Sequence, residues 1–360
     1  MNKVLWLCKS RYMGHDVIED RYARLFEIPT CLGRYAQVRG FCLDYRLAKA
    51  AAIPADLAPA WARANIPRTL FVGWFIQLLA YTRRFRPQAV VASSDCLHVI
   101  LGALLARVFG ARFYADLYDD YATFGLARVP GMRWLYRRAL ARADGICSVS
   151  RTLGQDVQQS YPGVPVLVLE STIDAGMFRP LDKAESRQRI GLDDVGAAKL
   201  VGICGGLNPF HGADIVFGAF AEIAAGNPDV LFVIAGQPHP DCPIPERDDV
   251  RFIGRLPHAD MPSFFSAMDL VVVPLSNTRF GYFAFPQKAY EVLACRTPAV
   301  AAEVGSLALL FESLPDVRYD PDSSSALAVA ALRQLDKPRL LEVDIPTWED
   351  QAKKLAEFIR

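Results

Sequence analysis

The sequence predicts an α/β protein with two Rossmann-like domains, each built on a parallel sheet. Its 360 residues suit two domains of ordinary size, each able to bury its own core. Short apolar runs alternate with helical patterns in both halves, as is typical of parallel sheets. The stretch from Leu270 to Gly305 predicts strand, loop, helix, strand and loop in succession.

The overall composition excludes several classes of protein. Forty basic and 39 acidic residues give a net charge of +1, so no global field favours nucleic acid as a partner. The eight cysteines are scattered without a Cys-x-x-Cys pair, which predicts reduced, buried thiols in a cytoplasmic protein. The apolar run Val4 to Cys8 is too short for a signal sequence, and no apolar stretch reaches the ~18 residues of a membrane span.

The first half predicts the opening domain. A strand at Lys3 to Cys8 precedes a loop at Lys9 to Asp16 and a long helical pattern from Ile18 to Tyr35. Further strands are predicted at 37–43, 89–92 and 112–117, and a helix is predicted at 96–109. Residues 44–67 show no clear periodicity. Because no G-x-G-x-x-G motif follows the first strand, a nicotinamide-dependent dehydrogenase loses its main support.

Two helical segments of the first half combine apolar and basic residues. Thr69 to Arg86 has a wide apolar surface and a basic end, and we favour packing against the core over contact with an anionic membrane. Met132 to Arg142 is rich in arginine, which is typical of a solvated face. The alternative is a basic helix that faces a membrane, which would suit a lipid-linked acceptor.

The second half predicts another domain of the same type. The segment Val166 to Pro180 closes the first sheet, and we assign residues 1–172 to the first domain and 173–345 to the second. The second domain begins with strands predicted at 199–204, 231–235 and 251–253 and a helix predicted at 213–225. An amphipathic helix is predicted at 348–359.

The stretch from Leu270 to Gly305 organises the second domain. Leu270 to Leu275 is short and rich in valine, as expected of a strand buried on both faces. A helix is predicted to begin near Pro286 and to end before Arg296, and residues 299–302 form the next strand. Ala289, Val292 and Leu293 share the face that packs, while Lys288 and Glu291 lie on the free face.

The start of this helix suits a nucleotide diphosphate. Unpaired N–H groups and the positive dipole end favour a phosphate, and Lys288 adds a full charge. Glu291, one turn further on, can accept two hydrogen bonds from the diol of a ribose. The alternative, weighted equally, is an exposed ion pair between Lys288 and Glu291 worth a few tenths of a kcal/mol.

At this point the sequence resembles a known family. Residues 285–305 (FPQKAYEVLACRTPAVAAEVG) are similar to the donor-binding signature of the family 4 (group 1) retaining glycosyltransferases. Segments in the family's order and spacing are Gly205 to Gly212, Val250 to Leu256, Asp116 to Asp120, Ala143 to Ser150 and Ile173 to Pro180. The resemblance implies a GT-B fold of two facing Rossmann-like domains, with residues 346–360 packing back on the N-terminal acceptor domain.

The resemblance also implies a nucleotide-sugar donor on the C-terminal domain, with departures from the family pattern. Glu291 matches the second acid of the family motif, which binds the ribose. Phe283 stands where many members carry the first acid, which binds the sugar hydroxyls. Phe283 and Phe285 would line the sugar site or belong to the core. Gly206 replaces the usual arginine and His211 the usual lysine, so Lys288 or Arg279 would compensate at the diphosphate. The remaining donor-side candidates are Gly205 and Asn208, with Gly254 and Arg255 in the nucleobase loop.

The acceptor side rests on weaker signals. Asp119 matches the acid of a His-Asp or His-Glu pair, Tyr118 takes the histidine's place, and Asp120 follows. These acids would orient an acceptor hydroxyl or take its proton, or they would merely cap a loop. The same alternatives apply to Gly14, His15 and Asp16 in the first loop.

No His, Cys or Asp cluster has metal-ligand spacing, and neither G-x-S-x-G nor a P-loop occurs, so no metal or cofactor is expected. We therefore expect a retaining, metal-independent, hexosyltransferase-like enzyme. It would move a sugar from a nucleotide sugar to a glycan or lipid-linked acceptor, in bacterial surface polysaccharide or glycolipid synthesis. Peripheral contact of the N-terminal domain with the inner face of the cytoplasmic membrane is expected. The alternative is a weakly active or inactive GT-B protein that serves as a binding or scaffold partner.

Overall fold

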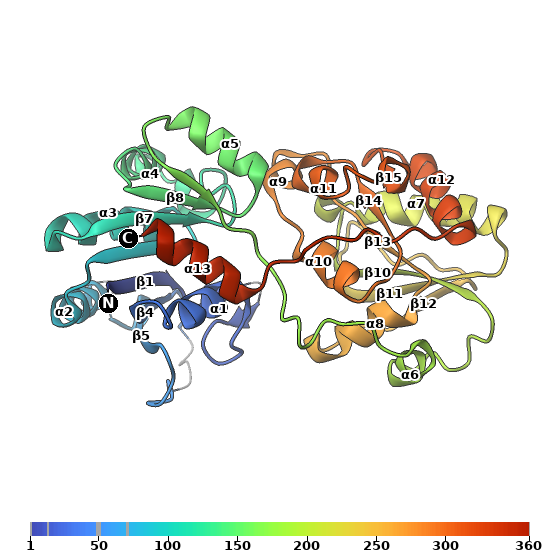
Figure 1. The fold of residues 1–360 in the computed structure, drawn as a ribbon, viewed down its shortest axis with the longest axis horizontal. Coiled ribbons are helices and arrows are strands. Elements are labelled where there is room, and N and C mark those ends of the chain that lie inside the picture. The colour runs from blue at the N-terminus through green and yellow to red at the C-terminus, as the bar shows by residue number, and fades with distance from the viewer. Residues whose placement is uncertain (1, 13, 48–51, 70–71, 360) are drawn as a thin grey trace. The chain divides into compact units, whose positions relative to one another are not determined.

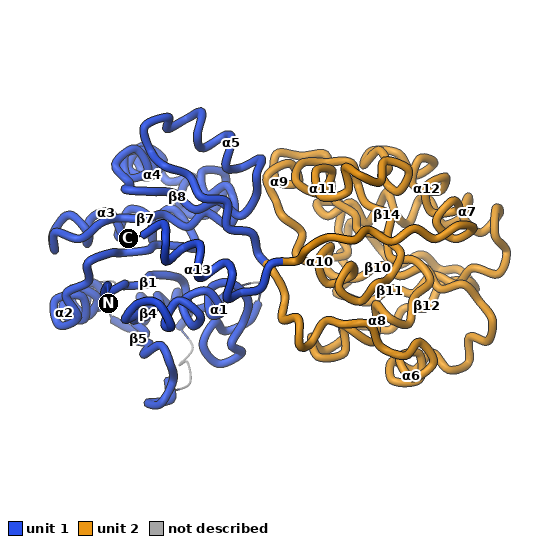
Figure 2. Tube along the Cα trace, viewed as in Figure 1, with its two compact units in different colours: residues 1–171, 346–360 blue, residues 172–345 orange. Residues whose placement is uncertain are grey.

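The computed structural model describes residues 2–12, 14–47, 52–69 and 72–359, and the chain divides into two compact units. Unit 1 comprises residues 1–171 and 346–360, and unit 2 comprises residues 172–345 (Figure 2). Each unit is a parallel sheet covered by helices, as the sequence predicts. The acceptor and donor roles expected for the two domains stay predictions.

Unit 1 is built on seven parallel strands within its described residues. The strands are β1 (Lys3–Lys9), β4 (Gln37–Asp44), β5 (Ala60–Asn65), β6 (Ala89–Ser93), β7 (Arg112–Leu117), β8 (Gly145–Ser148) and β9 (Val166–Val168). Their order in the sheet is β5-β4-β1-β6-β7-β8-β9 (Figure 1). The loop after β1 forms the small hairpin of β2 (Arg11–Tyr12) and β3 (His15–Asp16).

Helices cover both faces of this sheet. They are α1 (Ala23–Leu32), η1 (Pro67–Thr69), α2 (Gly73–Phe85), α3 (Cys96–Phe109), η2 (Gly125–Arg128), α4 (Met132–Leu140), α5 (Arg151–Ser160) and α13 (Trp348–Phe358). α1 and α13 pack on the face that carries Trp6. α3 lies on the opposite face, where Gly102 abuts Ala92 of β6, and α2 reaches that face through Tyr81, whose ring lies 5.3 Å from Phe41.

The C-terminal helix α13 packs on α1, which confirms the predicted return of the chain to the first domain (Figure 1). Its start is fixed by a capping box between Thr347 and Asp350. Glu349, in its first turn, accepts hydrogen bonds from Arg34 (2.7 Å) and from the hydroxyl of Tyr35 (2.5 Å). These contacts tie the last helix to the end of α1.

Unit 2 repeats the architecture with six parallel strands in its described residues. They are β10 (Lys199–Leu207), β11 (Val230–Pro238), β12 (Val250–Phe252), β13 (Leu270–Val273), β14 (Ala299–Ala302) and β15 (Arg318–Tyr319), in the order β12-β11-β10-β13-β14-β15. The helices are α6 (Lys183–Arg189), η3 (Pro209–His211), α7 (Ala213–Gly226), η4 (His258–Asp260), α8 (Met261–Ala267), α9 (Arg279–Phe283), α10 (Gln287–Ala294), α11 (Gly305–Leu310), η5 (Pro315–Val317) and α12 (Ser324–Asp336). α7 packs on β11 by stacking Phe220 on Phe232 at 3.9 Å, and α8 packs on the other face at Gly202.

Several local predictions need correction. The first helix begins at Ala23 and not at Ile18, because the carboxylate of Asp16 holds the N–H groups of Ile18 and Glu19 in a turn (3.0 and 3.1 Å). The segment 44–67 contains the edge strand β5. The loop expected before Pro286 contains α9, whose start is capped by Thr278 (3.2 Å to the N–H of Gly281). Two residues of the predicted helix 69–86, at 70 and 71, lie outside the described residues.

All eight cysteines are free, and all except Cys31 are buried, as predicted. Among the described residues, no helix has the length and apolar character that crossing a bilayer requires.

Candidate functional site

Lys288 lies in the first turn of α10, two residues after the cap residue Pro286. Its ammonium group donates a hydrogen bond to the backbone carbonyl of Cys204 in β10. Ala289 and Val292 are fully buried on the packed face, as the helical pattern predicts. The helix start and its cation are therefore fixed at the end of β10, the central strand where ligands enter α/β sheets.

Glycine residues at the ends of neighbouring strands lie close to this ammonium group. Gly205 has φ +105°, and a Cβ there would lie 2.8 Å from the Lys288 nitrogen. Gly236, its register partner on β11, also has positive φ, and a Cβ there would lie 2.2 Å from the Gly205 carbonyl oxygen. The N–H of Gly236 donates to the carbonyl of Gly254 in the loop after β12 (2.8 Å). Three strand ends thus come together at glycine positions.

Gly206 is adjacent to His211, which replaces the family's lysine. A Cβ at Gly206 would lie 3.0 Å from the His211 ring. The side-chain oxygen of Asn208 accepts from the backbone N–H of His211 (3.1 Å) and lies 2.9 Å from its Nδ1. Burial lowers the pKa of His211, and the charge of Lys288 lowers it further. The lowered pKa favours the neutral form of the His211 ring, which Asn208 holds in place.

Glu291 does not pair with Lys288. Its side chain is 13% exposed, and its Oε1 lies 3.4 Å from the Gln287 amide and 3.8 Å from Nε2 of His258. The alternative of an exposed Lys288–Glu291 ion pair is wrong, because the two charged groups have different neighbours. The carboxylate lies one turn beyond the start of α10.

His258 is a site residue that the sequence did not reveal. The nearby Glu291 carboxylate raises the pKa of His258, burial opposes this effect, and the charge of Asp174 adds to the increase. Its ring contacts Phe178 edge-on at 5.4 Å. The only sequence signal was a histidine shortly after the Gly254-Arg255 loop, and its partner Glu291 is far along the chain.

The aromatic residues between β13 and α10 are packed. Phe283 is buried, with the Arg279 guanidinium 4.7 Å from its ring. Phe285 is buried against Tyr290 at 4.8 Å. Both phenylalanines therefore belong to the core of unit 2, and any contact with a sugar stays a prediction. Arg255 is exposed beside Gly254, and a Cβ at Gly254 would meet no atom within 4 Å.

In unit 1, Asp119 and Asp120 follow β7. Burial raises the pKa of Asp119, although the N–H of Asp120 bonds its Oδ1 at 2.7 Å and the charge of Lys9 also favours the ionised form. Lys9, at the end of β1, lies 5.6 Å from the ring of Tyr118, and burial lowers its pKa. Lys9 is a second residue that sequence reasoning missed, because only the sheet order brings β1 close to the end of β7.

The first loop shows a structural role for Asp16. Its buried carboxylate accepts from Arg63 (2.6 Å) besides capping the turn at Ile18. His15 stacks on Tyr22 at 4.2 Å, and the carbonyl of Gly14 accepts from Arg11. The acceptor-side role expected for this loop stays a prediction.

No group of three or more His, Cys, Asp or Glu side chains suited to a metal ion occurs in the part of the chain that the structure describes. Metal independence stays a prediction.

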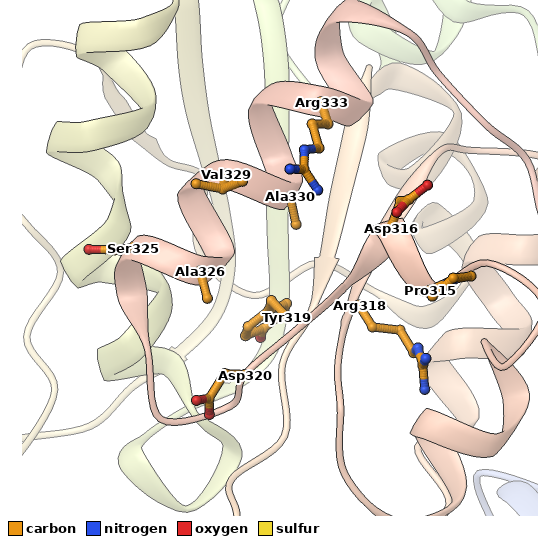
Figure 3. Close-up of a pocket in the computed structure, with 10 residues that line it drawn as sticks. All are labelled: Pro315, Asp316, Arg318, Tyr319, Asp320, Ser325, Ala326, Val329, Ala330 and Arg333. Atoms are coloured by element: carbon orange, nitrogen blue, oxygen red, sulfur yellow. The ribbon is translucent and has the colours of Figure 1, made fainter.

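A cavity of about 410 Å³ lies between α12 and the segment around β15 (Figure 3). It is lined by Pro315, Asp316, Arg318, Tyr319, Asp320, Ser325, Ala326, Val329, Ala330 and Arg333. Arg318 forms an ion pair with Glu303, with 3.0 Å between its guanidinium nitrogen and the carboxylate oxygen. None of the predicted site residues lines this cavity, so it is separate from the glycine-rich strand ends.

Comparison with known sequences finds similarity to glycosyltransferases, mainly in unit 2. Residues 198–337 match the family described as "Glycosyl transferases group 1". The D-inositol 3-phosphate glycosyltransferase of Segniliparus rotundus is 29% identical over 244 residues, which are 61% of this chain and 53% of the relative. That of Mycolicibacterium gilvum is 34% identical over 152 residues, which are 39% and 32% of the two chains. The chain therefore spans about half the length, or less, of these curated relatives.

Solved structures share the fold over almost the whole chain. Sucrose-phosphate synthase from Thermosynechococcus elongatus has a TM-score of 0.68 at 16% identity and covers 100% of this chain and 94% of its own. HepE from Anabaena, solved with UDP-glucose, has a TM-score of 0.66 at 18% identity, covering 99% and 95%. At such identities the likeness concerns the fold alone: the chain has the GT-B fold, and its sequence match to the group 1 glycosyltransferases covers residues 198–337.

Proposed function

We propose that the protein is a retaining, metal-independent glycosyltransferase whose nucleotide-sugar donor binds to unit 2. The observation that carries the proposal is the Lys288 ammonium at the N-terminus of α10, beside the glycine strand ends at Gly205 and Gly236. The helix dipole, free backbone N–H groups and this cation together would stabilise the departing diphosphate. Glu291 would accept hydrogen bonds from the ribose hydroxyls.

The donor sugar is the less defined part of the proposal. Phe283 stands in place of a carboxylate, so the usual acceptor for sugar hydroxyls is lacking at that position. HepE from Anabaena has been solved with UDP-glucose, which makes UDP-hexoses the first donors to test.

The acceptor is proposed to be a glycan or a lipid-linked sugar, used in bacterial surface polysaccharide or glycolipid synthesis on the cytoplasmic face of the membrane. Asp119, with its raised pKa, and Asp120 are the candidates to orient the acceptor hydroxyl. A soluble polyol phosphate is the competing acceptor class, because curated relatives are named D-inositol 3-phosphate glycosyltransferases.

A thermal-shift screen with UDP, GDP, TDP and their sugars tests the donor site, because a ligand that binds the folded state raises Tm. Calorimetry with Glu291→Ala then tests the ribose contact. We expect a loss of about 1.5–3 kcal/mol in binding free energy without unfolding. Equal nucleotide affinity in the wild type and the variant would refute the ribose assignment.

A weakly active or inactive binding protein is the second candidate. It is favoured by the neutral His211 and by Gly206, which replace two cations of the family pattern. Nucleotide binding without release of UDP from any UDP-sugar, in the presence of lipid and polyol acceptors, would support this second function.

A further inference from the structure

Four helical segments on one face of unit 1 carry an unusual charge pattern, whereas α5 on the same face carries both Arg151 and Asp156. α2, α3, η2 and α4 contain seven arginines and no aspartate, glutamate or lysine. The arginines are Arg83, Arg84, Arg107, Arg128, Arg133, Arg137 and Arg138. All seven are exposed, and none forms an ion pair with any residue that the structure describes. We call the outer surface of these four segments the basic helical face.

The same surface exposes large apolar side chains. Ile76 of α2 is 63% exposed, Val108 of α3 is 58% exposed, and Trp134 of α4 is 61% exposed. The guanidinium of Arg138 lies 5.2 Å from the Trp134 ring. α3 contacts both α2 and α4, so the three helices form one layer over the sheet (Figure 1). The inner side of α2 packs on the core through Leu78, as the sequence predicts.

The opposite face of the same unit has a different character. α1 and α13 carry Glu27, Glu349, Asp350 and Glu357 alongside their basic residues. The positive surface is therefore a local property of one helix layer and not a consequence of net charge, which is +1 for the chain.

We propose that the basic helical face binds the surface of a bilayer containing anionic phospholipid. Arginines without internal ion pairs complement lipid phosphates, and their aliphatic stems allow the charges to reach the headgroups while apolar groups enter the interface. An indole ring such as that of Trp134 prefers the headgroup level of a bilayer. A nucleic-acid partner would explain the arginines, but it does not require the exposed Trp134, Ile76 and Val108 as well. Self-association through this face is a separate outcome of the test below. The inference does not depend on the proposed transfer reaction.

Sedimentation with vesicles tests the proposal on the full chain. Vesicles of phosphatidylcholine with about a third phosphatidylglycerol should bind the wild type, and vesicles of phosphatidylcholine alone should bind it far more weakly. Arg137→Gln with Arg138→Gln should lower the partition coefficient by about 30-fold, at about fivefold per arginine. Trp134→Ala should lower it by several-fold.

A matched control lies on the opposite face. Lys353→Gln with Lys354→Gln on α13 removes the same charge from exposed positions, and its partition coefficient should stay within about twofold of the wild type. Melting curves of each variant confirm that it is folded. Quenching of Trp134 fluorescence by brominated lipid gives a second readout of insertion, and it should be lost in Trp134→Phe.

Four results would overturn the proposal. The first is no binding to anionic vesicles at low salt. The second is an equal loss of binding in the α13 control. The third is tighter binding to an oligonucleotide that is insensitive to Trp134→Ala, which would assign the face to a polyanion. The fourth is a dimer in solution that dissociates on Trp134→Ala, which would assign the face to self-association.

Discussion

Gly205→Ala should weaken nucleotide binding by displacing the Lys288 ammonium. The added Cβ would lie 2.8 Å from the lysine nitrogen and 3.3 Å from its Cε, so the side chain must move away from the carbonyl of Cys204. The glycine also has φ +105°, a conformation that alanine rarely adopts. The substitution therefore adds backbone strain and removes the cation from its position.

The two effects have separate magnitudes. Backbone strain at Gly205 should cost about 1–3 kcal/mol of folding free energy, which corresponds to a fall of roughly 2–12 °C in Tm for a unit of this size. Loss of one charged hydrogen bond to a diphosphate should cost a further 1.5–3 kcal/mol of binding, about 10- to 150-fold in Kd. Only the second effect depends on Lys288.

Calorimetry with UDP, alongside melting curves, separates these contributions. Gly196→Ala is a matched control, because Gly196 also has positive φ (+57°) and a Cβ there would meet no atom within 4 Å. It should lower Tm by a few degrees and leave UDP affinity unchanged. Lys288→Ala should reproduce the affinity loss of Gly205→Ala without its backbone strain. Full UDP affinity in Gly205→Ala would refute the assignment of the diphosphate to Lys288.

Three further outcomes are expected. Because the Glu291 carboxylate 3.8 Å away raises the pKa of His258, protonated His258 stabilises the fold below the ordinary histidine pKa. This contribution is lost as pH rises through the raised value. Melting curves should therefore show that His258→Gln destabilises the fold more at about pH 6 than at about pH 8.5. The extra loss of stability should be less than about 1 kcal/mol, because the ring is half exposed. An equal loss of stability at both pH values would contradict this prediction. Transfer activity should survive excess EDTA, and loss restored only by Mg²⁺ or Mn²⁺ would contradict protein-only stabilisation. Arg24→Met should cost about 3–5 kcal/mol in urea denaturation, because it leaves Asp116 as an unpaired buried charge, whereas the exposed Arg34→Met should cost under about 1 kcal/mol.

Local patterns predicted the elements whose own residues determine them. The strand at Ala299–Ala302 has the predicted bounds, and α10 starts next to Pro286 with Ala289 and Val292 buried. A short run of apolar residues, or a helical period that begins beside a proline, specifies its structure without distant partners. The first helix was predicted too long because its early turn is held by the carboxylate of Asp16, a contact that no periodicity reveals.

The sequence by itself determined the two-domain α/β fold, the resemblance to the group 1 glycosyltransferases and the two residues proposed as the centre of a donor site, Lys288 and Glu291. Tertiary structure alone decided how those residues are used. Lys288 bonds to a carbonyl of β10 and meets Gly205, not Gly206, and Glu291 faces His258 instead of forming a pair along its own helix. Each of these contacts joins segments that are distant in the chain, and their distances follow from strand order and register, which period and composition do not encode.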